Sequence, residues 1–401
     1  MNIGIKIYRK EKGAAIIRII KHFSVFILLL FFADNGMACR YTVREIGFAD
    51  FGKDSYQLIL FKDGTISETD IKLFENISSA ALLNTNITGK VIDIKKEKSS
   101  PFLKYYHRPD KGQWPDLIFV SPAEKVKVLR LYRQEDFTQS IWALLETIVT
   151  SPARDRLREH IVASYGVIYF IEGSRADENS VAERTIKQAV ERTEQIMTSL
   201  PKPVNKPPRV IRIKADDRES EDILLWSLGW EGNESKKPAV AIMYGRGRRM
   251  GPMLEGDFIR EEVITNMLRF VGEDCECGLD RTWMLGTMIP LRWDSDLKSN
   301  VLSEYGFDAD NPLVVSEMIQ ILSVAPARTN RSVDTGILYG YTENILKLSN
   351  PANKSGTTEP EMTDEGFFSG TVKSFTFSLI GIVLITIAGG FVIFRSRKTN
   401  T

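Results

Sequence analysis

The sequence is poor in the residues that most often carry chemistry. Among its 401 residues are only three cysteines and three histidines, without the spacing of zinc ligand pairs, so we expect neither a metal site nor a cofactor. Lys and Arg number 53 against 52 Asp and Glu, which leaves no excess positive charge to hold a nucleic acid. No Walker sequence, nucleophile elbow or His-Glu-x-x-His motif occurs. These absences argue against a nucleic-acid binder and against the common hydrolase and nucleotide-binding classes.

The N-terminus has the order of a secretory signal peptide. Basic residues precede an apolar run at 23–32, and the small residues Gly36 and Ala38 come just before Cys39. The apolar run is about half of the ~20 residues that a membrane-spanning helix needs. We therefore expect residues 1–38 to be removed, with an uncleaved signal anchor as the alternative.

A second apolar segment lies near the C-terminus, from Ser374 to Phe394, and contains no charged residue. At ~1.5 Å per residue it would span roughly 31 Å, the thickness of a bilayer's hydrocarbon core. The basic tail 395–401 follows it and should be cytoplasmic by the positive-inside rule. Polar residues at 349–373 predict a flexible stalk. We expect a single-pass cell-membrane protein whose residues 39–373 are periplasmic or extracellular.

Strand and helix patterns occur in the same order twice between these segments. Strand patterns of the first copy lie at 55–61, 90–94, 116–120 and 126–131, and helix patterns at 67–83, 101–107 and 137–149. Strand patterns of the second copy lie at 166–171, 209–213, 239–244 and 253–255, and helix patterns at 179–200, 219–228 and 258–271. Pro115 and Pro238 are 123 residues apart. We predict an α/β protein in which one βαβαββα unit is used twice, as domains 39–150 and 151–272.

This order, with a proline before the last hairpin, resembles the thioredoxin fold. The second copy is the more similar, because KPAVAIMYGRGRRMGPMLEG, from Lys237 to Gly256, follows the family's proline, strand, turn, strand and glycine. The resemblance implies two tandem thioredoxin-like domains, with Pro115 and Pro238 as candidates for cis peptide bonds that face the family's redox site. Alternatively, a proline is simply tolerated at the first residue of a strand.

The chain departs from the family at the redox motif itself. The family carries Cys-x-x-Cys where the first strand meets the first helix, and the helix N-terminus there lowers the thiol pKa. The corresponding residues are Lys62-Asp63-Gly64-Thr65 in the first copy and Glu172-Gly173-Ser174-Arg175 in the second. Neither copy can therefore perform standard thioredoxin chemistry.

The three cysteines are Cys39, Cys275 and Cys277. An odd number in a secreted protein leaves one thiol unpaired or bridged to another chain. Cys275 and Cys277 are the catalytic candidates if they form a redox pair; otherwise one of them bridges Cys39, or both stay reduced. The acidic residues around them raise rather than lower a thiol pKa, which argues against a reactive thiolate.

Two further regions are candidates for contacts. Arg246, Arg248 and Arg249 lie in a predicted hairpin turn, and their glycine-rich surroundings miss the dinucleotide fingerprint because a strand, not a helix, follows. This basic turn could contact an acidic partner or lipid headgroups, or could simply be solvated. Residues 273–348, which include Trp283 and Trp293, predict an extension packed on the second domain.

These observations favour a non-enzymatic role. We predict a membrane-anchored, extracytoplasmic binding or scaffold protein, built on redox-inactive thioredoxin-like modules, that binds a protein partner at the membrane surface within a membrane-associated complex. The alternative is an extracytoplasmic thiol-disulfide oxidoreductase that uses Cys275 and Cys277. Five Asn-x-Ser/Thr sequences would be glycosylated only in a eukaryotic secretory route; they begin at Asn76, Asn86, Asn233, Asn330 and Asn353.

Overall fold

The computed structural model describes most of the region between the predicted signal peptide and stalk. The described residues are 40–108, 115–131, 136–200, 202, 204–230, 237–274 and 285–323. The predicted signal peptide, stalk, membrane segment and tail lie outside them, as do all three cysteines. Within these ranges no helix combines the length and the apolar character that crossing a membrane requires.

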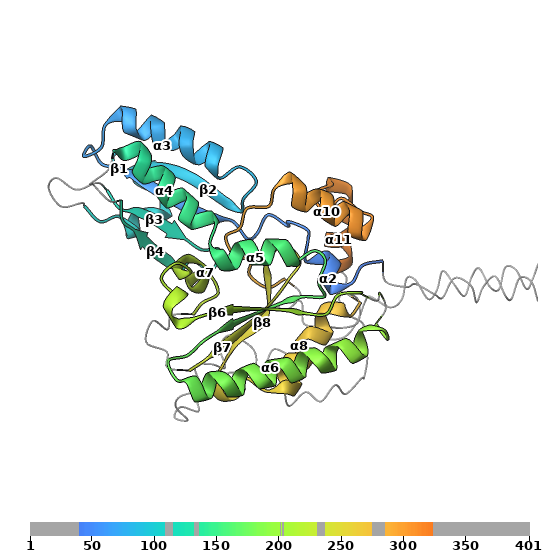
Figure 1. The fold of residues 1–401 in the computed structure, drawn as a ribbon. Helices are drawn as coiled ribbons and strands as arrows, with labels where there is room; N and C mark the ends of the chain where they lie inside the picture. Colours follow the sequence, from blue (N-terminus) through green and yellow to red (C-terminus); the bar gives the residue numbers. More distant parts are fainter. Residues whose placement is uncertain are drawn as a thin grey trace, which may run out of the picture. The chain divides into compact units, whose positions relative to one another are not determined.

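Two four-stranded sheets share one topology (Figure 1). The first has the order β2-β1-β3-β4, from β1 (Tyr56–Lys62), β2 (Ile87–Asp93), β3 (Leu117–Val120) and β4 (Val126–Leu129). The second has the order β6-β5-β7-β8, from β5 (Val167–Ile171), β6 (Arg209–Ile213), β7 (Ala239–Tyr244) and β8 (Arg248–Glu255). In each sheet the first two strands are parallel and the other pairs antiparallel. The predicted repeat is confirmed, and the strand order is thioredoxin-like.

Two helices pack together against each sheet. They are α3 (Glu68–Ala81) and α4 (Phe137–Val149) in the first unit, and α6 (Ala176–Met197) and α8 (Glu261–Gly272) in the second. Ser67 caps α3, as its sequence predicts, because its side chain accepts a hydrogen bond from the Asp70 backbone N–H. Burial of one face of each helix then forms the core beside each sheet.

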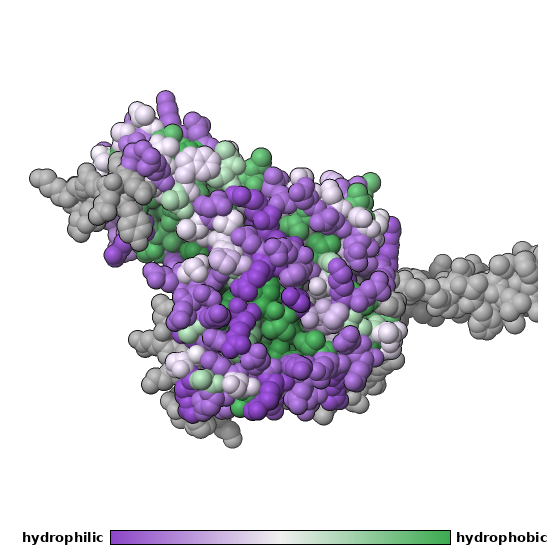
Figure 2. All heavy atoms as spheres, in the orientation of Figure 1, coloured by the Kyte–Doolittle hydropathy of each residue, from purple (hydrophilic) through white to green (hydrophobic). Residues whose placement is uncertain are grey.

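The opposite faces of the two sheets are covered differently. In the first unit the expected helix at 101–107 is a short 3-10 helix, η1 (Pro101–Tyr105), whose side chains pack on Ile59, Phe61, Ile118 and Val120. In the second unit that face is covered by α5 (Pro152–His160) and α7 (Asp222–Ser227). Figure 2 shows a mainly hydrophilic face on which apolar atoms gather between α5 and α6.

The N-terminal segment packs on the second unit, although it precedes the first unit in the sequence. Its short helix α2 (Val43–Ile46) is fully buried, and Tyr41, Val43, Ile46 and Ala49 join the core formed around β5 and α8. A capping box between Thr42 and Glu45 begins the helix. Sequence proximity to the first unit does not decide where these apolar side chains are buried.

The described part of the C-terminal extension, residues 285–323, packs on the second unit and also contacts the first. It contains α10 (Ser295–Tyr305) and α11 (Pro312–Ser323), and Trp293 is 2% exposed in the second core. The Trp293 backbone N–H donates to the carbonyl of Asn84 at 2.6 Å. The Asn86 side chain donates to the Ile289 carbonyl at 3.1 Å and accepts from the Leu291 N–H at 3.2 Å. Residues 289–293 therefore connect the two sheets.

Helix α7 contributes to both cores. Leu224 and Leu225 pack in the core of the second unit. Ile223 and Trp226 pack instead in the core of the first. The Trp226 ring lies 5.2 Å from that of Phe119, centroid to centroid. The two units thus share a helix rather than meeting only at a polar interface.

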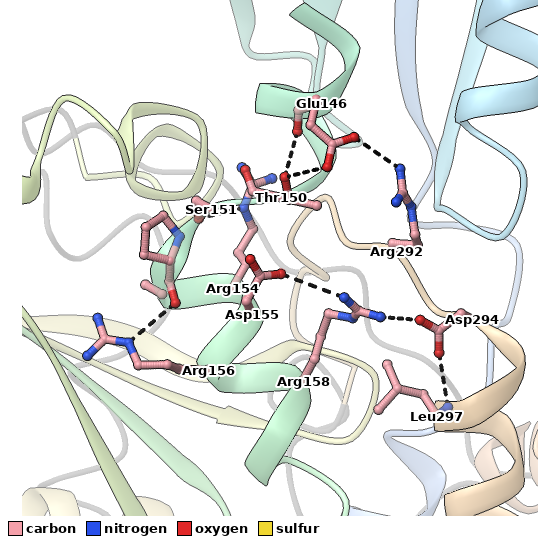
Figure 3. Close-up of polar contacts among 12 residues, drawn as sticks. Glu146, Thr150, Ser151, Arg154, Asp155, Arg156, Arg158, Arg292, Asp294 and Leu297 are labelled. Atoms are coloured by element: carbon pink, nitrogen blue, oxygen red, sulfur yellow. Dashed lines mark hydrogen bonds and ion pairs between the residues drawn. The ribbon is translucent and has the colours of Figure 1, made fainter. Parts of the chain in front are cut away.

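The linker helix α5 is held by buried polar contacts. Arg154 is completely buried and donates to the carbonyls of Thr147 and Thr150 at the end of α4, and to Pro290 of the extension. The carbonyls of Thr147 and Thr150 lie at the C-terminal end of α4, where the helix itself supplies no N–H donor, and the guanidinium of Arg154 takes that place. Figure 3 shows Arg158 lying between Asp155 and Asp294, an ion-pair contact to the extension. The connection between the units is therefore ordered and internally bonded.

Candidate functional site

The start of α3 occupies the place of the family's redox motif in the first unit. The Asp63 carboxylate accepts hydrogen bonds from the Thr65 N–H at 2.8 Å and from the Tyr106 hydroxyl at 2.8 Å. Partial burial pushes the pKa of Asp63 up, but the hydrogen bonds from Thr65 and Tyr106 outweigh it and leave that pKa below its ordinary value. The carboxylate is therefore a fixed acceptor that closes the turn.

The corresponding loop of the second unit is closed by an amide. Asn179 accepts from the Gly173 N–H at 2.7 Å and donates to the Gly173 carbonyl at 3.0 Å. Arg175 forms ion pairs with Asp177 at 2.7 Å and with Glu178 at 3.1 Å. Neither helix start holds a sulfur atom, so the chemistry left at both positions is hydrogen bonding.

A hollow of about 200 Å³ lies beside the helix start of the second unit. Its lining combines apolar and charged side chains, from α6, from the entry to β7 and from the end of β8: Asp177, Glu178, Val181, Ala182, Lys237, Pro238, Gly256, Asp257 and Ile259. Val181 is 54% exposed, and Phe258, which is adjacent to the lining in sequence, is 53% exposed. The hollow therefore combines accessible apolar side chains with charged ones.

The charges of this hollow are mainly acidic. Three carboxylates, of Asp177, Glu178 and Asp257, line it against the single ammonium of Lys237. Lys237 lies 3.7 Å from Asp257. One oxygen of Glu178, Oε2, is buried and accepts no hydrogen bond from any described residue. The exposed carboxylate of this lining is that of Asp257, whose side chain is 97% exposed.

Sequence reasoning named Lys237, Pro238 and Gly256 among these lining residues, and only Pro238 as a site candidate. The others could have been located from the fold, because the start of the first helix and the end of the last strand meet beside that proline. The peptide bond before Pro238 is trans, so the cis bond that the resemblance implied is not present there. The Pro238 carbonyl accepts from the Gly256 N–H at 2.9 Å, which extends the hairpin as an ordinary strand would. The bond before Pro115 involves Trp114, outside the described residues.

The arginines of the predicted basic turn were expected to lie at the surface. This prediction is wrong, because their guanidinium groups pair with carboxylates and backbone carbonyls of the same chain. Arg248 is fully buried; it pairs with Asp54 at 2.8 Å and donates to the carbonyl of Ala49 at 3.0 Å. Arg246 pairs with Asp310 at 2.6 Å. Arg249 donates to the carbonyl of Gly251 at 2.9 Å, and to that of Leu228. The three guanidinium groups hold the hairpin against its neighbours.

The remaining sequence candidates are not described by the structure. Cys39, Cys275 and Cys277 all lie outside the described ranges, and so does Trp283. Their bonding and any redox role therefore stay predictions. In the part of the chain that is described, no group of three His, Cys, Asp or Glu side chains is arranged to hold a metal ion.

Comparison with known proteins finds similarity only among solved structures. No family model and no curated protein matches the chain. The first two thioredoxin domains of Saccharomyces cerevisiae Eps1p are 10% identical, with 54% of this chain and 92% of that chain covered and a TM-score of 0.20. The zinc-bound form of human ERp44 is 12% identical, with 57% and 58% covered and a TM-score of 0.19. The bb fragment of ERp72 is 12% identical, with 55% and 91% covered and a TM-score of 0.18.

Similarity at these TM-scores does not by itself establish the fold class. The fold class rests on the two sheets, whose strand order and connections are thioredoxin-like. The chain is an α/β protein with two thioredoxin-like units, and the sulfur-free helix starts distinguish both units from the redox-active members of that fold.

Proposed function

We propose that this chain is a membrane-anchored, extracytoplasmic binding or scaffold protein whose thioredoxin-like units have no redox function. The observation that carries the proposal is the closure of both helix starts by oxygen and nitrogen groups, of Asp63 and Asn179, where the redox members of the fold carry sulfur. A signal peptide at 1–38 and a membrane segment at 374–394 are the sequence features that support the location.

The contact site in this proposal is the hollow beside Pro238. A partner would insert an apolar side chain between Val181 and Ile259 and place a lysine or arginine near Asp257, whose side chain is 97% exposed. Arg175 already neutralises part of the acidic rim, so the apolar contact would supply most of the affinity. The partner is therefore a protein segment with neighbouring apolar and basic residues.

The binding test compares surface variants of the full chain in native membranes. Val181→Asp and Phe258→Asp, alone and together, should abolish cross-linking between the chain and its partner. Leu313→Asp is the matched control, because Leu313 is 80% exposed on α11 and lies outside the hollow. Equal cross-linking by all variants would show that the hollow is not the contact site.

The redox test addresses the alternative directly. The purified chain should show no insulin reduction above buffer, and Cys275→Ser with Cys277→Ser should leave partner cross-linking intact. Turnover that disappears in this double variant would replace the scaffold proposal with an oxidoreductase.

A further inference from the structure

Two of the five Asn-x-Ser/Thr sequences lie wholly within the described residues, and the structure places them in different environments. They are Asn76-Ile77-Ser78 and Asn86-Ile87-Thr88. We propose that Asn76 carries an N-linked glycan and that Asn86 stays unmodified in the folded protein. The inference rests on the proposed extracytoplasmic location and concerns a eukaryotic secretory route.

Asn76 lies on the solvent face of α3. Ile77 and Ser78 beside it point into the unit, whereas Lys72 and Ala80, one turn before and one turn after Asn76, are exposed as it is. A sugar attached to Asn76 would extend from this exposed face and would displace only water.

Asn86 uses its side chain to hold the extension. Its Nδ2 atom donates to the carbonyl of Asp54 at 3.3 Å and to that of Ile289 at 3.1 Å, and its Oδ1 atom accepts from the Leu291 N–H at 3.2 Å. A glycan replaces one of the two Nδ2 hydrogens, so at least one of these donated bonds is lost. The sugar would also need the space of the acceptor that it replaces, which is the carbonyl of Asp54 or of Ile289. Glycosylation of Asn86 and this packing around its side chain are therefore mutually exclusive.

The transfer is a substitution that needs no oxidant or reductant. Nδ2 of Asn76 bonds to C1 of an oligosaccharide carried on a lipid pyrophosphate. The bond between C1 and the pyrophosphate oxygen breaks, the amide loses one proton, and the lipid pyrophosphate leaves with the bonding electron pair. The lipid-linked oligosaccharide is the only co-substrate.

The test translates the full chain with endoplasmic reticulum microsomes, once with its own N-terminus and once with a heterologous cleavable signal replacing 1–38. Protease protection reports entry into the lumen, and peptide mass spectrometry after enzymatic deglycosylation reports occupancy of each asparagine. In protected, folded chains we expect glycan on Asn76 and none on Asn86. Failure of the native N-terminus alone to enter would contradict the proposed location, while the heterologous form still decides the glycan assignment.

Two variants separate modification from structure. Asn76→Gln should remove one glycan and leave the melting temperature of the deglycosylated protein unchanged. Asn86→Gln should remove no glycan and lower that temperature, because it breaks the contacts to residues 289–291. A protected chain with unmodified Asn76, or a folded chain that carries glycan on Asn86, would overturn the inference.

Discussion

Thr42 pairs with Asp274 in an isolated antiparallel bridge. Beside it, the Val43 N–H donates to the Glu273 carbonyl at 2.9 Å. The first described residues of the chain therefore lie next to the end of α8, although the two segments are far apart in the sequence. The three cysteines lie outside the described residues, each within three residues of Thr42 or Asp274 in the sequence.

The bridge limits how far apart Cys39 and Cys277 can lie. Cys39 precedes Thr42 by three residues, and Cys277 follows Asp274 by three. An extended chain advances at most ~3.6 Å per residue, so three residues on either side leave both cysteines within reach of the bridge. We predict a disulfide between Cys39 and Cys277 in an oxidising compartment, with Cys275 left as a thiol.

Peptide mapping of the unreduced protein, with free thiols blocked first, checks this pairing. The linked peptide should contain Cys39 and Cys277 and should persist in Cys275→Ser, which serves as the matched control. Cys39→Ser should abolish it. A bridge between Cys275 and Cys277, or three blocked thiols in protein taken from an oxidising compartment, would contradict the prediction.

Trp226 should couple the stability of the two units. Its ring packs on Tyr56 and Phe119 of the first sheet, although the residue belongs to a helix of the second unit. Trp226→Ala should cost about 3 kcal/mol, the lower end for aromatic truncation in a core, because the ring is only partly buried. Trp142→Ala, at a side chain that is 46% exposed, should stay within about 0.5 kcal/mol.

Chemical denaturation followed by far-UV circular dichroism gives both values. We expect one cooperative transition in the parent protein, because α7 and residues 289–293 connect the cores. Two separate transitions in the parent, or equal costs for the two tryptophan variants, would show that the units unfold independently.

Local patterns in the sequence predict most elements of this fold. The helix at 137–149 and the strand at 209–213 were expected with the bounds that the structure has. The order of strands and helices along the chain, βαβαββα in each unit, was expected as well. These features depend on hydrophobic periodicity and turn residues, which are contained in a few consecutive positions.

The sequence contains no comparable local pattern from which the long-range contacts could be predicted. Arg248 was expected at the surface because an arginine in a glycine-rich turn is usually solvated. Its partner Asp54 lies 194 residues away, and no local pattern connects the two. Arg154 was missed for the same reason, since its acceptors are carbonyls of a neighbouring helix end and of the extension. The hollow beside Pro238 likewise forms only when the start of α6 lies beside the residues that enter β7 and those that follow β8.

Asp310 should make stability depend on pH in acid. Burial tends to raise its pKa, but Lys298 at 2.9 Å and Arg246 at 2.6 Å prevail and hold that pKa below its ordinary value. A carboxylate with a lowered folded pKa adds stability above the unfolded pKa of about 3.9 and loses it as pH falls through the folded value. The melting temperature of Asp310→Asn should therefore lie below that of the parent at pH 7, and the gap should close toward pH 3.

The matched control for this pH dependence is Asp257→Asn. The Asp257 side chain is 97% exposed, and its partner Lys237 is 3.7 Å away, so solvent screens the pair. This variant should follow the parent curve across the same pH range. A constant gap for Asp310→Asn from pH 7 to pH 3 would show that its effect is not electrostatic.

Gly245 should be the least replaceable glycine of the β7–β8 hairpin. Its φ is +53°, and an added Cβ would lie 2.2 Å from the carbonyl carbon of Gly47. The hairpin is held there by the Arg246 N–H, which donates to the Gly47 carbonyl oxygen at 2.8 Å. Gly52 also has a positive φ, +71°, but a Cβ there would meet nothing within 4 Å. Comparing the two separates backbone strain from close packing.

Gly52→Ala should lose only the backbone preference, about 1 kcal/mol. Gly245→Ala carries the same strain and must in addition push the segment around Gly47 away, for which overpacking typically adds about 1–3 kcal/mol. Because that segment also supplies the carbonyls that Arg248 binds, its displacement should weaken the buried Arg248–Asp54 pair as well. Denaturation midpoints of the two variants measure the difference, and a loss in Gly245→Ala no larger than in Gly52→Ala would mean that the hairpin does not pack against Gly47 in solution.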